Sequence, residues 1–425
     1  NSCIMSVAFD SNVTLTLEIA FDSDPLATSP SYTDISSYLR TFNINRGRAN
    51  ELGEFVAGNM QFSVSNADNR FNPSNTSSPY YDSSAGKSKI QPLKRVRLSA
   101  VYDSSTYRLF TGFLDTVPVK YIAHGADSIV TFTAVDAFRL FQNQTIQSVG
   151  WRLGTAGFSE LGQSTRIGYV DVQELTSDRV GRLLDSIGFP SADRTINTGT
   201  KQIQQQAITT NLLTALRECE TAENGQFFMA GDGKAMFRNR AYKYTNAKAT
   251  TVQGTFDNSG SNLPYTNVAT SFDTNEVINV YEWTRTGGST QYIADADSVI
   301  SYTALSSTKS TKNINDSDVL SIIQEKSAET AIPILRIDSI TMNPRQDVNL
   351  WAKTLGLELG DRVKVNITNP DSSTFSDELF VESIKHSVHS GNQSWQYQLT
   401  LSPAGSSAWV IGQAKLGEGT RFAYS

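Results

Sequence analysis

The chain has 425 residues, with 36 basic and 42 acidic side chains and a formal net charge of −6. That length predicts two to four modules rather than one small core. The mild acidity argues against a dedicated nucleic-acid binder, which would carry a basic face. No run approaches the ~20 apolar residues that a membrane span needs, and we expect no signal peptide at the first residues. The cysteines, Cys3 and Cys219, predict reduced thiols in a protein assembled in the cytoplasm.

The first third of the chain has the pattern of half-buried β-strands. Polar and apolar residues alternate in four segments, 14–21, 60–64, 95–102 and 128–135. Loops rich in Asn, Asp, Gly and Pro separate them. Antiparallel sheets with one wet face give this alternation, whereas parallel sheets show continuous apolar runs. The pattern therefore predicts an antiparallel sandwich or barrel.

The middle of the chain has helical periodicity. Residues 177–187 place their apolar side chains on one face, with Ser177 as a plausible N-cap and Gly188 and Pro190 beyond the end. Further helices are expected at 211–223 and 317–330. Between those two helices, the strands 226–229 and 234–237 flank a Gly-Asp-Gly turn, which predicts a β-hairpin.

The C-terminal part returns to β character. Residues 334–342 alternate, a short helix is expected at 349–355, and strands are expected at 362–367, 379–384 and 395–401. The sequence therefore predicts a mainly β protein with helical insertions, β at both ends and α+β in the middle.

The three histidines do not form a recognisable metal motif. His386 and His389 lie three residues apart in an expected strand, so their side chains should point to opposite faces. His124 is remote in sequence, and zinc needs three or four convergent ligands. We therefore predict no catalytic, cofactor-binding or metal site, and no enzyme activity.

Three short motifs also fail their tests. Gly86-Lys87-Ser88 resembles the end of a phosphate-binding loop but lacks its first glycine, because position 81 is Tyr. Asp295-Ala296-Asp297 resembles a calcium loop but has Ile300 where that loop needs Gly. Gly157-Phe158-Ser159 lacks the final glycine of a nucleophile elbow. Paired carboxylates for glycoside cleavage stay an open alternative, since none of the 42 acids is marked out.

One basic stretch stands out before and within the strand at 95–102. It contains Lys87, Lys89, Lys94, Arg95 and Arg97. It could contact an acidic partner or passing DNA. The simpler interpretation, which we favour, is the solvent face of an edge strand, where Lys discourages unwanted pairing.

Taken together, several weak segments in a fixed order resemble the minor tail or tail-hub proteins of long-tailed siphophages, especially those of actinobacteria. The segments are 32–40, 45–52, 57–73, 109–113, 134–137, 179–194, 275–280, 359–363, 381–386, 395–403 and 409–417. They span almost the whole chain.

This resemblance implies a fold with two tube-type antiparallel β-barrels and helix-containing peripheral domains. Residues 1–145 would form the first barrel, and 251–290 with 336–402 the second. The second barrel would combine the strand around 275–284 with the C-terminal strands. Residues 146–250 with 291–335 would form the peripheral α+β domains, and 403–425 a C-terminal extension.

The resemblance also implies a structural role at the tail tip of the virion, after assembly in the host cytoplasm. A homotrimeric ring would connect the tail tube or distal tail ring to host-binding fibres and contact the tape-measure protein. It would contribute the channel for DNA ejection, with no specific DNA binding and no cofactor. The net acidity suggests a lumen that repels phosphates. The alternatives are a distal tail ring protein, or a tail-associated carbohydrate-binding protein or glycan hydrolase.

Overall fold

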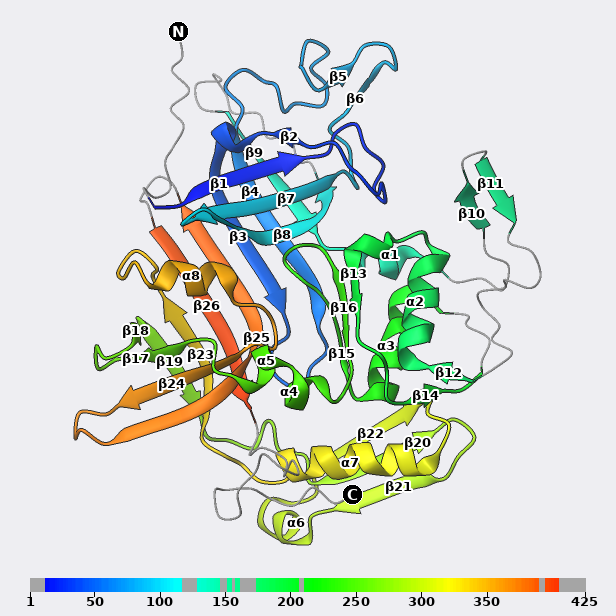
Figure 1. Ribbon diagram of the computed structural model, residues 1–425, viewed down its shortest axis with the longest axis vertical. Coiled ribbons are helices and arrows are strands. Elements are labelled where there is room, and N and C mark those ends of the chain that lie inside the picture. The colour runs from blue at the N-terminus through cyan, green and yellow to red at the C-terminus, as the bar shows by residue number, and fades with distance from the viewer. Residues whose placement is uncertain are drawn as a thin grey trace.

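The computed structural model describes residues 12–116, 128–145, 151–154, 157–160, 173–205, 210–389 and 394–404. Cys3, His124 and residues 405–425 of the expected C-terminal extension lie outside these ranges. Most described strands join one 14-stranded, largely antiparallel sheet, and helices lie beside it (Figure 1). The predicted class, mainly β with helical insertions, is therefore confirmed.

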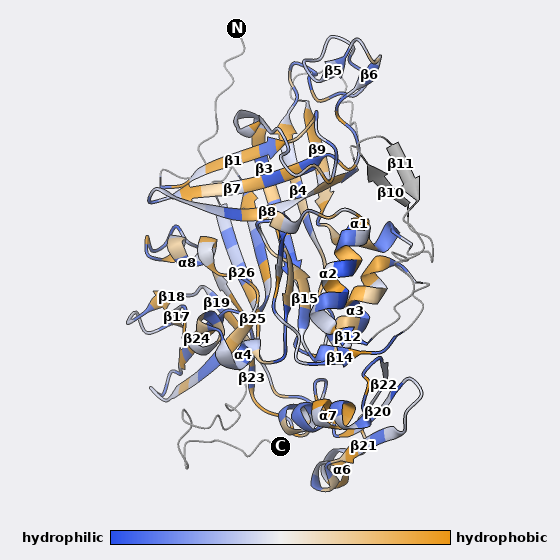
Figure 2. Ribbon diagram, turned by 45° about the vertical axis from the view of Figure 1, so that its right-hand side comes forward, coloured by the Kyte–Doolittle hydropathy of each residue, from blue (hydrophilic) through white to orange (hydrophobic). Residues whose placement is uncertain are grey.

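The N-terminal part forms one half of this sheet. Its strands follow the order β3-β4-β9-β8-β7-β1-β2. They are β1 (Thr14–Ile19), β2 (Thr33–Asp34), β3 (Leu39–Gly47), β4 (Val56–Ser65), β7 (Arg95–Tyr102), β8 (Ser105–Thr116) and β9 (Ile129–Val135), and the small hairpin β5 (Tyr81–Asp82) and β6 (Lys87–Ser88) projects from them. Hydrophilic and hydrophobic residues alternate along these strands (Figure 2), which is why one face is buried.

The C-terminal part forms the other half. Its elements are β17 (Thr255–Asp257), β18 (Leu263–Pro264), β19 (Asn267–Ser271), β23 (Arg336–Met342), α8 (Leu350–Gly356), β24 (Arg362–Thr368), β25 (Thr374–His389) and β26 (Ser394–Pro403). Helix α8 packs on the N-terminal core, where Trp351 meets Trp395 with ring centroids 4.9 Å apart. The two halves therefore share a core as well as a sheet.

Strand β25 joins the halves. Its first part pairs with β24 up to Phe380, and from Ser383 the same strand pairs with β3. A β-bulge lies at this point, because the register with β26 shifts between Val381 and Ser383. Among the described residues the strand path runs from β18 to β2 without returning, so the expected closed barrels are not formed. A 16-residue strand shared by both halves links them instead.

The middle of the chain lies against the sheet as a helical module. It contains α1 (Phe138–Asn143), α2 (Thr176–Ser186), α3 (Leu212–Glu223), β12 (Glu174–Leu175), β13 (Arg194–Ile196), β14 (Gln202–Ile203), β15 (Gln226–Met229), β16 (Ala235–Arg238), α4 (Tyr242–Thr245) and α5 (Ala247–Thr250), with the separate hairpin β10 (Trp151–Gly154) and β11 (Gly157–Glu160). The predicted helices α2 and α3 and the hairpin β15–β16 are confirmed. Asn211 caps α3 by accepting a hydrogen bond from Thr214 N at 2.8 Å.

Residues 280–330 form a small separate unit, called here the α7 unit. It contains β20 (Val280–Arg285), β21 (Thr290–Ala294), α6 (Ala296–Tyr302), β22 (Ser306–Thr311) and α7 (Asp316–Thr330). The strand expected at 275–284 was assigned wrongly to the C-terminal strands, since β20 pairs with β21 and β22. The reason is its burial: Tyr281 and Trp283 pack against Val319, Ile322 and Ile323 of α7. The strand that pairs with the C-terminal strands instead of β20 is β19, whose partner is β23.

Candidate functional site

The two histidines within the described residues occupy different environments on β25. His386 is buried and His389 is exposed, which agrees with the predicted opposite faces. His386 Nδ1 accepts a hydrogen bond from Trp395 Nε1 at 3.4 Å, and its ring lies 4.8 Å from that of Tyr397. Burial, helped by Arg46, lowers the pKa of His386 to about 3. The neutral ring is therefore a packed core group.

The weak motifs take ordinary structural roles. Gly86 and Lys87 lie at the tip of the β5–β6 hairpin, where no helix follows. Asp295 is the N-cap of α6 and accepts a hydrogen bond from Ser298 N at 2.9 Å. Cys219 is buried on α3, and burial raises its thiol pKa. Within the described ranges, no group of three or more His, Cys, Asp or Glu is placed to hold a metal.

The basic stretch was interpreted wrongly as the face of an edge strand. Strand β7 is internal, because β1 pairs with one edge and β8 with the other. Its charges are largely engaged: Arg97 contacts Glu18 at 2.6 Å, Arg95 contacts Asp193 at 3.2 Å, Lys89 contacts Asp22 at 2.7 Å and Lys94 Nζ donates to Ser23 O at 3.1 Å. The alternation predicted a wet face with Arg95, Arg97 and Ser99, but Arg95 is 7% exposed and Ser99 is 3% exposed, so this face is largely covered.

Two buried ion pairs fasten the halves of the sheet near the bulge in β25. Arg46 on β3 contacts Glu358 at 2.8 Å, and Gly231 N donates to the same carboxylate at 3.0 Å. Burial alone would raise the pKa of Glu358, but Arg46 holds it below its usual value. Next to it, Arg48 contacts Glu382 at 2.5 Å. Such pairs are costly to break, since the remaining charge would be buried alone.

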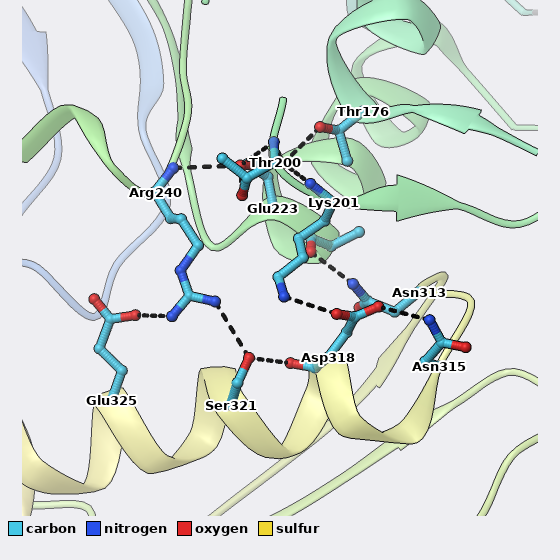
Figure 3. A network of polar contacts seen from close by, with 11 residues as sticks. Thr176, Thr200, Lys201, Glu223, Arg240, Asn313, Asn315, Asp318, Ser321 and Glu325 are labelled. Carbon is cyan, nitrogen blue, oxygen red and sulfur yellow. Dashed lines mark hydrogen bonds and ion pairs between the residues drawn. The ribbon is translucent and has the colours of Figure 1, made fainter. Parts of the chain in front are cut away.

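A polar network joins the helical module to the α7 unit (Figure 3). The buried carboxylate of Glu223, at the end of α3, accepts hydrogen bonds from Thr176 Oγ1 at 2.6 Å and from Thr200 N and Lys201 N at about 3 Å. Lys201 then reaches across to Asp318 on α7 at 2.7 Å. Fully satisfied buried networks rigidify the parts that they connect.

The same seam continues along α7. Glu325 binds Arg240 at 2.7 Å and Lys243 at 2.8 Å, and it accepts a hydrogen bond from Tyr244 at 2.9 Å. Burial works against ionisation of Glu325, but Lys243 and Arg240 outweigh it and lower the pKa to about 2. Glu325 is therefore an ionised group with two cationic partners across the seam.

We expect Glu325→Gln to weaken this docking by roughly 1–2 kcal/mol, because Arg240 loses its carboxylate partner and Lys243 loses one of two, while the side chain keeps its shape. Hydrogen exchange of the α7 amides should become about 5–30 times faster. Glu329→Gln is the matched control, since Glu329 is more exposed and, within the described ranges, forms an ion pair with Lys243 alone. Equal exchange rates in both variants would contradict the role of Glu325.

One strand edge lies open for a neighbour. Among the described residues β19 pairs only with β23, and its residues are exposed or half-buried. An unpaired edge presents free backbone N–H and C=O groups to another chain. In the α7 unit, β21 and β22 are likewise the outer strands of their sheet.

Five exposed apolar side chains come from the residue after β19, from α6 and from the segment between α7 and β23. They are Phe272, Ile300, Tyr302, Ile332 and Leu335. The pairing of Ser271 with Arg336 brings Phe272 near Leu335, and the hydrogen bond from Ser298 to Ala331 O, 2.5 Å long, brings α6 near Ile332. Ile300 is 83% exposed and Phe272 is 68% exposed. Exposed apolar side chains of this size can contribute to an interaction surface.

Neither the unpaired edge of β19 nor the exposed apolar side chains could be predicted from the sequence, and the reasons differ. The residues of β19 carry no apolar alternation, and a free edge is a property of the finished sheet. The exposed apolar side chains come from three separate segments of the chain.

None of the helices in the described part of the chain combines the length and the apolar content that a membrane span requires.

The fold has relatives among solved structures. The tail protein from Neisseria meningitidis MC58 matches with a TM-score of 0.55 and 10% identity, over 92% of this chain and 96% of that one. The 43 kDa tail protein of prophage MuSo2 from Shewanella oneidensis matches with a TM-score of 0.53 and 10% identity, over 92% and 98%. No family model matches the sequence, and the curated proteins gave no match. At this identity the likeness shows a shared fold.

Proposed function

We propose that this chain is a structural tail protein of a bacteriophage and, more specifically, a hub subunit at the tail tip. The observation that carries the proposal is the shared fold with two tail proteins over nearly the full length of all three chains. A non-enzymatic role is part of the proposal, as is the absence of catalytic, metal and cofactor residues.

The open surfaces support assembly into a ring. A second chain could add a strand to the unpaired edge of β19 and cover the exposed Phe272 that follows it. A contact between two different surfaces closes into a ring when the rotation between subunits closes. We propose a homotrimer that joins the tail tube or distal tail ring to host-binding fibres and lets DNA pass.

We also propose how the parts of the chain divide into domains of the ring. The N-terminal half of the sheet and the C-terminal strands would line the ring as two hub-type domains, and the helical module and the α7 unit would lie outside it. Charged seams such as Arg46–Glu358 and Lys201–Asp318 would keep these parts in one orientation. The setting proposed is the tail tip of a siphophage, similar to those of actinobacteria, assembled in the host cytoplasm.

Symmetry is the measurement that tests this function. We expect class averages of negatively stained purified protein to show threefold rings, with a solution mass near three times the 46.6 kDa chain mass. Labelled antibodies should mark the tail tips of intact virions. Sixfold rings would favour the distal tail ring protein. Turnover of a bacterial cell-wall glycan would favour the hydrolase and contradict a purely structural role.

A further inference from the structure

A basic cleft of about 520 Å³ lies between the N-terminal half of the sheet, the helical module and the segment that follows α8. Five basic and two acidic side chains line it, an excess of three positive charges. They are Arg46, Arg108, Lys234, Arg238, Lys248, Asp232 and Glu358. His386 also faces the cleft, but burial keeps it neutral. The lining is therefore basic although the whole chain is acidic, while Lys234 pairs with Asp232 and Lys248 pairs with Asp361, each at 3.7 Å.

Two of these arginines are buried and keep an unused donor. Arg46 is 5% exposed and Arg238 is 3% exposed. Arg46 binds Glu358, and Arg238 Nη1 donates to Leu359 O at 2.6 Å. The Nε–H group of each has no partner within the described residues. A buried donor without an acceptor costs roughly 1–3 kcal/mol, and because both Nε atoms are buried, an acceptor in the cleft would recover this when the arginine side chains shift toward it.

The guanidinium of Arg238 is held in place by aromatic rings. Its Cζ lies 4.7 Å from the centroid of Phe228 and 4.2 Å from that of Tyr242. Stacking of this kind fixes the plane of a guanidinium before a ligand arrives. A pre-ordered planar fork fits a carboxylate with two parallel hydrogen bonds.

The basic lining continues beyond the cleft. A second hollow of about 230 Å³ shares Arg108 and Asp232 with the basic cleft and adds Arg95, Arg97 and Tyr32. Basic side chains therefore follow one another between β7, β8 and the helical module, with Arg95 paired to Asp193 of the same hollow and Arg97 paired to Glu18. Such a row fits an extended segment with several negative charges better than a single small ion.

We propose that the basic cleft binds an acidic peptide segment of a protein partner, with its carboxylates on Arg46 and Arg238. The dimensions and charges favour a peptide over nucleic acid. A volume of this size admits side chains and a short backbone but no duplex. Glu358 and Asp232, beside the arginines, repel any anion, but a peptide can place uncharged residues next to them, whereas a phosphate backbone carries a charge at every nucleotide. This proposal does not depend on the tail-hub function, because charge and shape alone define the partner.

The test uses the full chain and a fluorescein-labelled octaglutamate peptide, with binding followed by fluorescence anisotropy at low salt. We expect saturable binding that weakens about tenfold or more in K234E/K248E, which reverses two charges on the rim. The milder K234Q/K248Q should weaken binding about threefold and serves if the reversal unfolds the protein. K87E/K385E is the control, since both lysines are exposed and Lys385 lies on the face of β25 opposite His386.

Two further probes sharpen the result. Inorganic phosphate and an oligothymidylate of eight nucleotides, about equal in charge to the peptide, should compete at least tenfold less well. Equal competition by the oligothymidylate would overturn the peptide proposal in favour of nucleic acid. Absent peptide binding, or equal loss in K87E/K385E, would overturn the site itself. Neither result would change the ring symmetry that tests the proposed function.

Discussion

Replacing Gly47 by Ala should lower the free energy of unfolding by about 3–5 kcal/mol and loosen the junction between the two halves of the large sheet. Gly47 ends β3 with a φ of +117°, a backbone conformation that side chains rarely adopt. A Cβ at this position would overlap Glu382 O and lie 2.6 Å from Ser383 Cα. Both partners are backbone atoms of β25, so neither can move without disturbing the strand.

The position of Gly47 makes this strain local to the junction. It pairs with Ser383, at the bulge where β25 leaves β24 and joins β3. The buried pair Arg48–Glu382 and the hydrogen bond from Arg48 N to Glu382 O, 2.9 Å long, lie in the same place. A shift of β25 away from an added methyl group would therefore lengthen those contacts as well.

Hydrogen exchange of the β3 and β25 amides, with urea denaturation for the whole chain, measures the effect of Gly47→Ala. Gly86→Ala is the matched control, because Gly86 also has a positive φ, +62°, but no atom lies within 4 Å of the position that a Cβ would take there. Gly86→Ala should lower the free energy of unfolding by about 1 kcal/mol, from backbone strain alone. If Gly47→Ala lowered the free energy of unfolding no more than the control does, that result would contradict the close packing of β3 against β25.

The periodic elements could be predicted from the sequence because their signals are local. Strand β26 alternates over its whole length, and α2 places Val180, Leu183 and Leu184 on one buried face. The short helix α1 and the two-residue strands gave no such signal. Too few residues contribute to a period in elements of that size.

The candidate surfaces could not be predicted because they depend on long-range pairing. Nothing near Arg97 in the sequence indicates that β1 covers the second edge of β7. Arg46 and Glu358 are 312 residues apart, and Arg238 reaches Leu359 across another 121. The charge pattern marked the basic stretch correctly but gave it the wrong neighbours, because register and strand order are properties of the whole sheet.

The second large effect concerns pH, where we expect His386→Gln to flatten the dependence of stability between about pH 7 and pH 4.5. The folded state holds the pKa of His386 at about 3, whereas an unfolded histidine titrates near 6.5. As the pH falls below about 6.5, the His386 side chain therefore binds a proton in the unfolded chain but stays neutral in the folded chain. Stability is lost over this window, at up to about 1.4 kcal/mol per pH unit.

Other buried groups oppose this loss in the same window. Burial raises the pKa of Asp136 to about 7 and that of Asp361 to about 6. Their folded forms bind protons more readily than the unfolded chain, so these two carboxyl groups favour folding as the pH falls. The pH dependence of the native chain's stability is the sum of these opposing contributions. The contribution of His386 is therefore obtained from the difference between the native chain and a variant that lacks this histidine.

The comparison is therefore between His386→Gln and His389→Gln, with urea denaturation at both pH values. Glutamine can still accept the hydrogen bond from Trp395 Nε1 but cannot titrate. Between about pH 7 and pH 4.5 the His386 variant should lose about 2–3 kcal/mol less stability than the native chain. His389 is exposed, so its variant should follow the native profile. If both variants follow that profile, His386 is protonated in the folded state. The ring would then have a partner for its charge, and the packing against Trp395 and Tyr397 would not exclude a proton.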